Sequence, residues 1–126
     1  MERTRFIEHG GRNILFMDFS GVNDKPDALR IIEEARQFVA AQPKRRHLLT
    51  LVDVNGSRFD GEIVDALKAL ARHNQPWVLA GAVAGMSALQ RVVYRIINSF
   101  SGRRLAAFDS TQEAKDWLVR QAASTT

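Results

Sequence analysis

The chain has 126 residues, 45% of them hydrophobic, and a formal net charge of +4. That length and apolar content suit a single domain with one core, over residues 1–126. The sequence has no cysteine, which excludes disulfides and thiolate metal sites and favours a cytoplasmic location, and no apolar stretch is long enough for an integral membrane segment.

Basic residues cluster compactly in only two places, residues 44–46 and 103–104. Such clusters suit an acidic partner, a phosphate or a membrane surface, and the alternative is that they simply solubilise the protein. A nucleic-acid-binding domain of this size would show a broader basic face with exposed aromatic side chains. We therefore predict no nucleic-acid partner.

The chain opens with two apolar runs, residues 5–8 and 13–19, which a pair of glycines separates. This pattern predicts an antiparallel hairpin. From Pro26 the period becomes helical, and Pro43 follows the end of this predicted helix. Its apolar stripe consists of Ala28, Ile31, Ile32, Ala35 and Val39.

The middle of the chain alternates between buried strands and amphipathic helices. Residues 47–54 form a continuous β-favouring run, as expected for a strand covered on both faces. Asp60 then caps a helix that runs to about His73, and residues 77–83 form another buried strand. The stripe of this helix consists of Ile63, Val64, Leu67, Leu70 and Ala71.

Two Ser-x-x-Gln/Glu capping boxes mark the last helices, beginning at Ser87 and Ser110. The first opens a third helix, which ends before Gly102. A short strand at residues 104–108 separates it from the final helix, whose last residues, 122–126, we expect to fray. Ala114, Trp117 and Leu118 of the final helix should point inward.

The predicted order is β-β-α-β-α-β-α-β-α, which implies an α/β fold with a mixed, mostly parallel sheet of about five strands and about four helices. Together with four segments, this order resembles the STAS fold of anti-sigma-factor antagonists and of sulfate-transporter cytoplasmic domains. The likeness is greatest to small stand-alone bacterial SpoIIAA-like proteins. The segments are NILFMDFSG, LLTLVDVNGSRF, AVAGMSALQRVVY and SGRRLAAFDSTQEAKDWL.

The resemblance implies a regulatory protein-interaction module whose partner docks on the loop at residues 53–62. In anti-sigma antagonists that loop presents a phosphorylatable Ser after an Asp. Here the Asp matches Asp60, but Gly61 and Glu62 follow, so the expected hydroxyl is missing. The implied partner is an anti-sigma-factor-like kinase or a transporter component, and the predicted partner-binding residues are Asp53, Asn55, Ser57, Arg58, Asp60 and Glu62.

Two of these residues have alternative interpretations. Ser57 could replace the missing phosphorylation site, but a Ser beside Asn55-Gly56 is also an ordinary turn residue. Glu62 could imitate a permanent phosphate, or it could be an acid that the helix dipole favours in the first turn. Similarly, Asp18 and Asp53 at strand ends could hold a cation or bond nearby backbone, and we predict no metal.

A glycine-rich turn before the third helix offers free backbone donors to an anion. Gly85, Ser87, Arg91 and Arg103 are the predicted ligand-binding residues there, although close packing explains the glycine equally well. This gives an alternative function, a sensor for a small anion, nucleotide or lipid. The apolar third helix could also form a homodimer contact. We predict no enzyme and no cofactor, because no nucleophile and base stand at a recognisable spacing.

Overall fold

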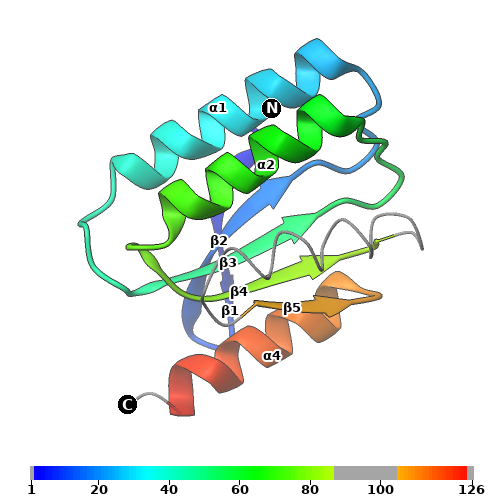
Figure 1. Ribbon diagram of the computed structural model, residues 1–126. Helices are drawn as coiled ribbons and strands as arrows, with labels where there is room; N and C mark the ends of the chain where they lie inside the picture. The colour runs from blue at the N-terminus through cyan, green and yellow to red at the C-terminus, as the bar shows by residue number, and fades with distance from the viewer. Residues whose placement is uncertain (1, 87–104, 125–126) are drawn as a thin grey trace.

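A computed structural model describes residues 2–86 and 105–124 of the chain (Figure 1). The predicted third helix lies outside the described residues. Within them, five strands form one sheet in the order β1-β2-β3-β4-β5. The elements are β1 (Thr4–His9), β2 (Arg12–Asp18), α1 (Lys25–Ala40), β3 (Leu48–Asp53), α2 (Gly61–Asn74), β4 (Val78–Ala84), β5 (Leu105–Phe108) and α4 (Thr111–Ser124).

The predicted hairpin is confirmed. β1 and β2 are antiparallel and close on the pair His9 and Arg12, while β2, β3, β4 and β5 run parallel to one another. Gly10 and Gly11 form the turn with φ of 57° and 78°, a conformation that suits a tight hairpin and is costly for other residues. The carboxyl ends of the parallel strands therefore share one edge of the sheet.

The sheet separates two apolar layers, with α1 and α2 on one face and α4 on the other (Figure 1). Along β2 the side chains alternate between these layers, as strand geometry requires. Leu15 and Met17 join the α1 and α2 layer, whereas Ile14 and Phe16 join the α4 layer. Both faces of the central strands are thus covered, which explains why their sequences read as continuous apolar runs.

Aspartate or serine side chains cap all three described helices. Oxygens of Asp24, Asp60 and Ser110 accept from the backbone N–H three residues later, at 3.3, 3.0 and 3.2 Å. The caps predicted at Asp60 and Ser110 are confirmed. In a complete capping box the Glu113 carboxylate would accept from the Ser110 backbone N–H. Here it accepts from the Ser110 hydroxyl instead, at 3.2 Å.

Two expectations need correction. The final helix does not fray from residue 122, because α4 continues to Ser124 and Ala122 is buried in the layer beneath the sheet. Trp77 is buried but precedes β4, which begins at Val78. Trp117 is only half-buried and packs against Phe108, with ring centroids 5.6 Å apart.

No described helix is long and apolar enough to cross a membrane.

Candidate functional site

Two matching loops follow β2 and β3 at the carboxyl edge of the sheet. Each begins with an aspartate, Asp18 or Asp53, and these two residues are neighbours in the strand ladder. In each loop the aspartate Oδ1 accepts the backbone N–H two residues later, from Ser20 at 2.9 Å and from Asn55 at 3.0 Å. The side chains of Ser20 and Asn55 donate to the same oxygens. Both aspartates are thus engaged in shaping their own loops.

Backbone hydrogen bonds join these loops and continue the sheet beyond its strands. Gly21 N–H donates to the Asn55 carbonyl at 2.8 Å, and Val54 N–H donates to the Ala84 carbonyl at 3.0 Å. Further along, the Arg58 N–H donates to the loop after β2, at 2.9 Å. The predicted partner loop is therefore anchored along its length by neighbouring chain segments.

The structure brings Asn55, a predicted partner residue, against Gly85, a predicted ligand residue. A Cβ at Gly85 would lie 2.2–2.4 Å from the side-chain atoms of Asn55, and Gly85 has a φ of 82°. The backbone conformation thus favours glycine, and a larger residue would displace the Asn55 side chain. This favours the packing explanation of Gly85. Ser87, Arg91 and Arg103 lie outside the described residues.

Ser57 and Asp60 also have structural roles in the loop. The Ser57 hydroxyl donates to the Val54 carbonyl at 2.7 Å. The Asp60 carboxylate accepts from the Ile63 N–H and pairs with Lys25 Nζ at 3.1 Å. The N–H bond, and then the contact with Lys25, lower the pKa of Asp60, while the same contact raises the pKa of Lys25. Asp60 thus links the starts of α1 and α2.

Arg58 and Glu62 are different, because both are exposed and the described residues give neither side chain an ion pair. Gly61 lies between them, and no atom is within 4 Å of the position that a Cβ would occupy there. A serine would therefore fit at position 61. Neither the available space nor the backbone conformation explains why the chain has a glycine there instead of a residue with a hydroxyl. Arg58 on the loop and Glu62 in the first turn of α2 are exposed charged groups, and the charge of Glu62 also helps to raise the pKa of Lys25.

Among the described residues, no three His, Asp or Glu side chains cluster as metal ligands would. Asp18 and Asp53 are adjacent, but the donors of their own loops already occupy Oδ1 of each carboxylate. Arg3, which is not among the predicted site residues, donates to the Ser20 carbonyl at 2.9 Å and lies 3.7 Å from Asp18. Nothing near Arg3 in the sequence signals this contact, since its partners are 15–17 residues away.

Comparison with solved structures identifies the fold. The chain is similar to an uncharacterised protein of the DUF3478 family with a SpoIIAA-like fold from Shewanella loihica PV-4, with a TM-score of 0.71 and 16% sequence identity. The match covers 91% of each chain. The protein thus has a SpoIIAA-like fold, as predicted. No family model and no curated protein matches the sequence.

Proposed function

We propose that the protein is a non-enzymatic regulatory module whose partner binds the β3–α2 loop and the first turn of α2. One observation carries this proposal: Arg58, on a loop that backbone bonds hold in place, and Glu62, in the first turn of α2, are exposed charges without ion pairs among the described residues. A preformed loop binds with little loss of conformational entropy. The SpoIIAA-like fold supports this proposal.

Regulation in this proposal does not use the phosphoswitch of anti-sigma antagonists at its usual position. Gly61 has no hydroxyl, and Glu62 supplies a permanent negative charge in the first turn of α2. The partner therefore meets a surface of constant charge. We expect that partner to be an anti-sigma-factor-like kinase or a transporter component.

The proposal is tested by site-specific crosslinking. A photo-crosslinking amino acid at position 58 or 62 should capture the partner, whereas the same amino acid at position 8 or 120, on β1 and α4, should not. The captured protein is identified by mass spectrometry and its binding is then measured with purified components.

Charge reversal supplies the quantitative measurement. Arg58→Glu and Glu62→Lys should each weaken binding about tenfold, since they juxtapose like charges at the interface. The matched controls, Arg120→Glu and Glu8→Lys, should bind as the wild type does. If Arg58→Glu and Glu62→Lys bound the recovered partner with unchanged affinity, the β3–α2 loop would not be its docking surface.

A further inference from the structure

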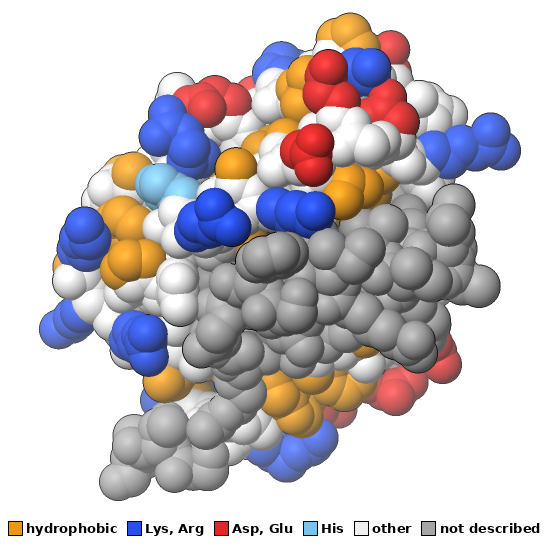
Figure 2. Space-filling model, viewed as in Figure 1, with side chains coloured by type: hydrophobic (Ala, Val, Ile, Leu, Met, Phe, Trp, Pro, Cys, Tyr) orange, Lys and Arg blue, Asp and Glu red, His pale blue; other side chains and the backbone are white. Residues whose placement is uncertain are grey.

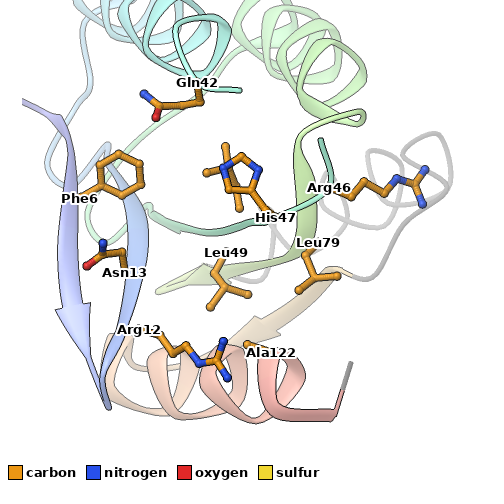
Figure 3. A pocket seen from close by; sticks show the side chains of 10 residues that line it. Phe6, Arg12, Asn13, Gln42, Arg46, His47, Leu49, Leu79 and Ala122 are labelled. Atoms are coloured by element: carbon orange, nitrogen blue, oxygen red, sulfur yellow. The ribbon is translucent and has the colours of Figure 1, made fainter. Parts of the chain in front are cut away.

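A second feature lies at the opposite edge of the sheet, where the parallel strands begin. An open hollow of about 690 Å³ lies between the loop before β3, the start of β2 and the end of α4 (Figure 3). Ligand pockets generally have volumes of about 300–1,000 Å³, so the hollow has room for a small molecule. It is distinct from the β3–α2 loop, since β3 begins at one site and ends at the other.

The polar lining of this hollow is basic. Arg12, Arg46 and His47 line it, and none of the described lining residues is acidic. Arg30 pairs with Glu34 at 2.9 Å and Arg36 pairs with Glu33, whereas no described acid pairs with Arg12 or Arg46. Unpaired guanidinium groups attract anions and bind phosphate or carboxylate through two parallel hydrogen bonds.

Figure 3 shows basic side chains at two sides of the hollow. Arg12 extends beside Ala122 of α4, His47 lies in the middle of the lining, and Arg46 lies on the far rim with its guanidinium turned away from the centre. Both arginines are exposed, so rotation about side-chain bonds can bring Arg46 to a bound anion. Figure 2 likewise shows Lys and Arg side chains at the side where β3 and β4 begin, whereas acidic side chains lie mainly at the top and right.

The loop that carries Arg46 and His47 is fixed by Trp77. The indole Nε1–H donates to the Gln42 carbonyl at 3.1 Å, and the Trp77 carbonyl accepts from His47 N–H at 3.1 Å. His47 Nδ1 lies 2.8 Å from the Arg45 carbonyl, which can only accept, so Nδ1 donates. In that tautomer Nε2 is an acceptor, so it suits a hydroxyl or other donor group of a ligand rather than an anionic oxygen. The backbone that carries Arg46 and His47 is therefore held in place before any ligand binds.

The remainder of the lining is largely apolar. Phe6 is 41% exposed, although large apolar side chains are usually buried, and Leu79 is half-buried. Leu48, Leu49 and Ala122 contribute buried apolar surface. A purely inorganic anion would leave the exposed surface of Phe6 and Leu79 in water, whereas an anion with an apolar portion would cover it.

We propose that this hollow binds a small organic anion, in which a phosphate or carboxylate contacts Arg12 and Arg46 while an apolar portion packs on Phe6 and Leu79. The shared chemistry fits either a free metabolite or a lipid headgroup with its adjoining chain. This site goes beyond the proposed regulatory function and does not depend on the β3–α2 loop.

Hexyl phosphate is a suitable probe, with inorganic phosphate and hexanol as its separate halves. Titration followed by amide chemical shifts should move Leu49, Leu79 and Ala122, and hexyl phosphate should bind at least about tenfold more tightly than either half. Arg12→Gln and Arg46→Gln should each weaken binding at least about fivefold, because each removes a charged hydrogen-bond donor. Arg30→Gln, which removes the same charge from α1, should bind as the wild type does.

Vesicles distinguish the two sources. Binding to phosphatidylglycerol vesicles that depends on Arg12 and Arg46, without binding of free hexyl phosphate, identifies a lipid headgroup; the reverse result identifies a free metabolite. The proposal is overturned if neither probe binds, if shifts gather at the carboxyl edge, or if Arg30→Gln weakens binding as much as Arg12→Gln. Equal binding of inorganic phosphate would also overturn it, because the apolar surface would then contribute nothing.

Discussion

The contact between Gly85 and Asn55 makes a sharp stability prediction. In Gly85→Ala, the new Cβ would lie 2.2–2.4 Å from the Asn55 side chain, so that side chain must leave its position. It would then lose the hydrogen bond from Asn55 Nδ2 to Asp53 Oδ1, which is 2.7 Å long. The substitution thus has two separate costs, one in the backbone of residue 85 and one in the loop after β3.

The backbone cost arises because Gly85 has a φ of 82°. An alanine in this left-handed region costs about 1–2 kcal/mol. The displaced Asn55 side chain adds about 1 kcal/mol, the net value of one ordinary hydrogen bond. We therefore expect Gly85→Ala to lower the free energy of unfolding by about 2–3 kcal/mol, which in a chain of this size lowers Tm by roughly 6–15 °C.

Two comparisons separate these costs in urea and thermal unfolding. Gly21→Ala is the matched control. Gly21 lies in the loop after β2 and has a similar φ of 70°, but no atom lies within 4 Å of the position of its Cβ. It should lose only the backbone cost, about 1–2 kcal/mol. Asn55→Ala removes the obstructing atoms, so the double variant Asn55→Ala/Gly85→Ala should be about as stable as Gly85→Ala alone. If the two substitutions were additive within about 0.5 kcal/mol, the reasoning would be refuted.

Two further predictions concern charge and the missing hydroxyl. The pKa of Asp116 is lowered mainly by its 2.7 Å hydrogen bond with His9 Nε2. The ionised carboxylate therefore stabilises the fold at pH values above about 3.9, the ordinary pKa of aspartate. This stabilisation is lost as the pH falls below that value. The urea midpoint should therefore fall more steeply below pH about 4 in the wild type than in Asp116→Asn, and parallel pH profiles would contradict this. At Gly61, no atom lies within 4 Å of the position of a Cβ, and the backbone is not left-handed, so Gly61→Ser should change the free energy of unfolding by less than about 1 kcal/mol. A larger loss in thermal unfolding would show that position 61 excludes a side chain.

Local patterns were sufficient to predict the described elements. Periodicity identified α1 and α2, and the glycine pair identified the hairpin, because these features depend on residues that are close in the chain. The end of α4 was mispredicted although local spacing indicates it. Ala122 follows Ala114 and Leu118 at intervals of four residues, so it continues the buried stripe of the helix and packs beneath the sheet.

The candidate site was predictable as a loop but not in its detail. The sequence placed six residues there by resemblance, and the structure gives Asp53, Asn55, Ser57 and Asp60 hydrogen bonds that shape the loop. Some of the partners come from distant segments, such as Gly85 for Asn55 and Lys25 for Asp60. Such contacts depend on the order of strands in the sheet, which local patterns do not encode. The basic hollow was missed for the same reason, since β2, β4 and α4 all contribute to it.

The positions of the two proposed sites indicate how they relate to each other. β3 leaves the hollow at Leu48 and reaches the carboxyl edge at Asp53, and the five residue steps between them span about 17 Å. Coupling over that distance needs an element with two discrete arrangements. β3 pairs with β2 on one side and with β4 on the other, and its side chains pack into both apolar layers. A shift of β3 by one residue would move these buried side chains to the opposite face of the sheet, so β3 has one stable arrangement. An anion in the hollow and a protein on the β3–α2 loop should therefore bind independently, and the sheet acts as a rigid support that separates them.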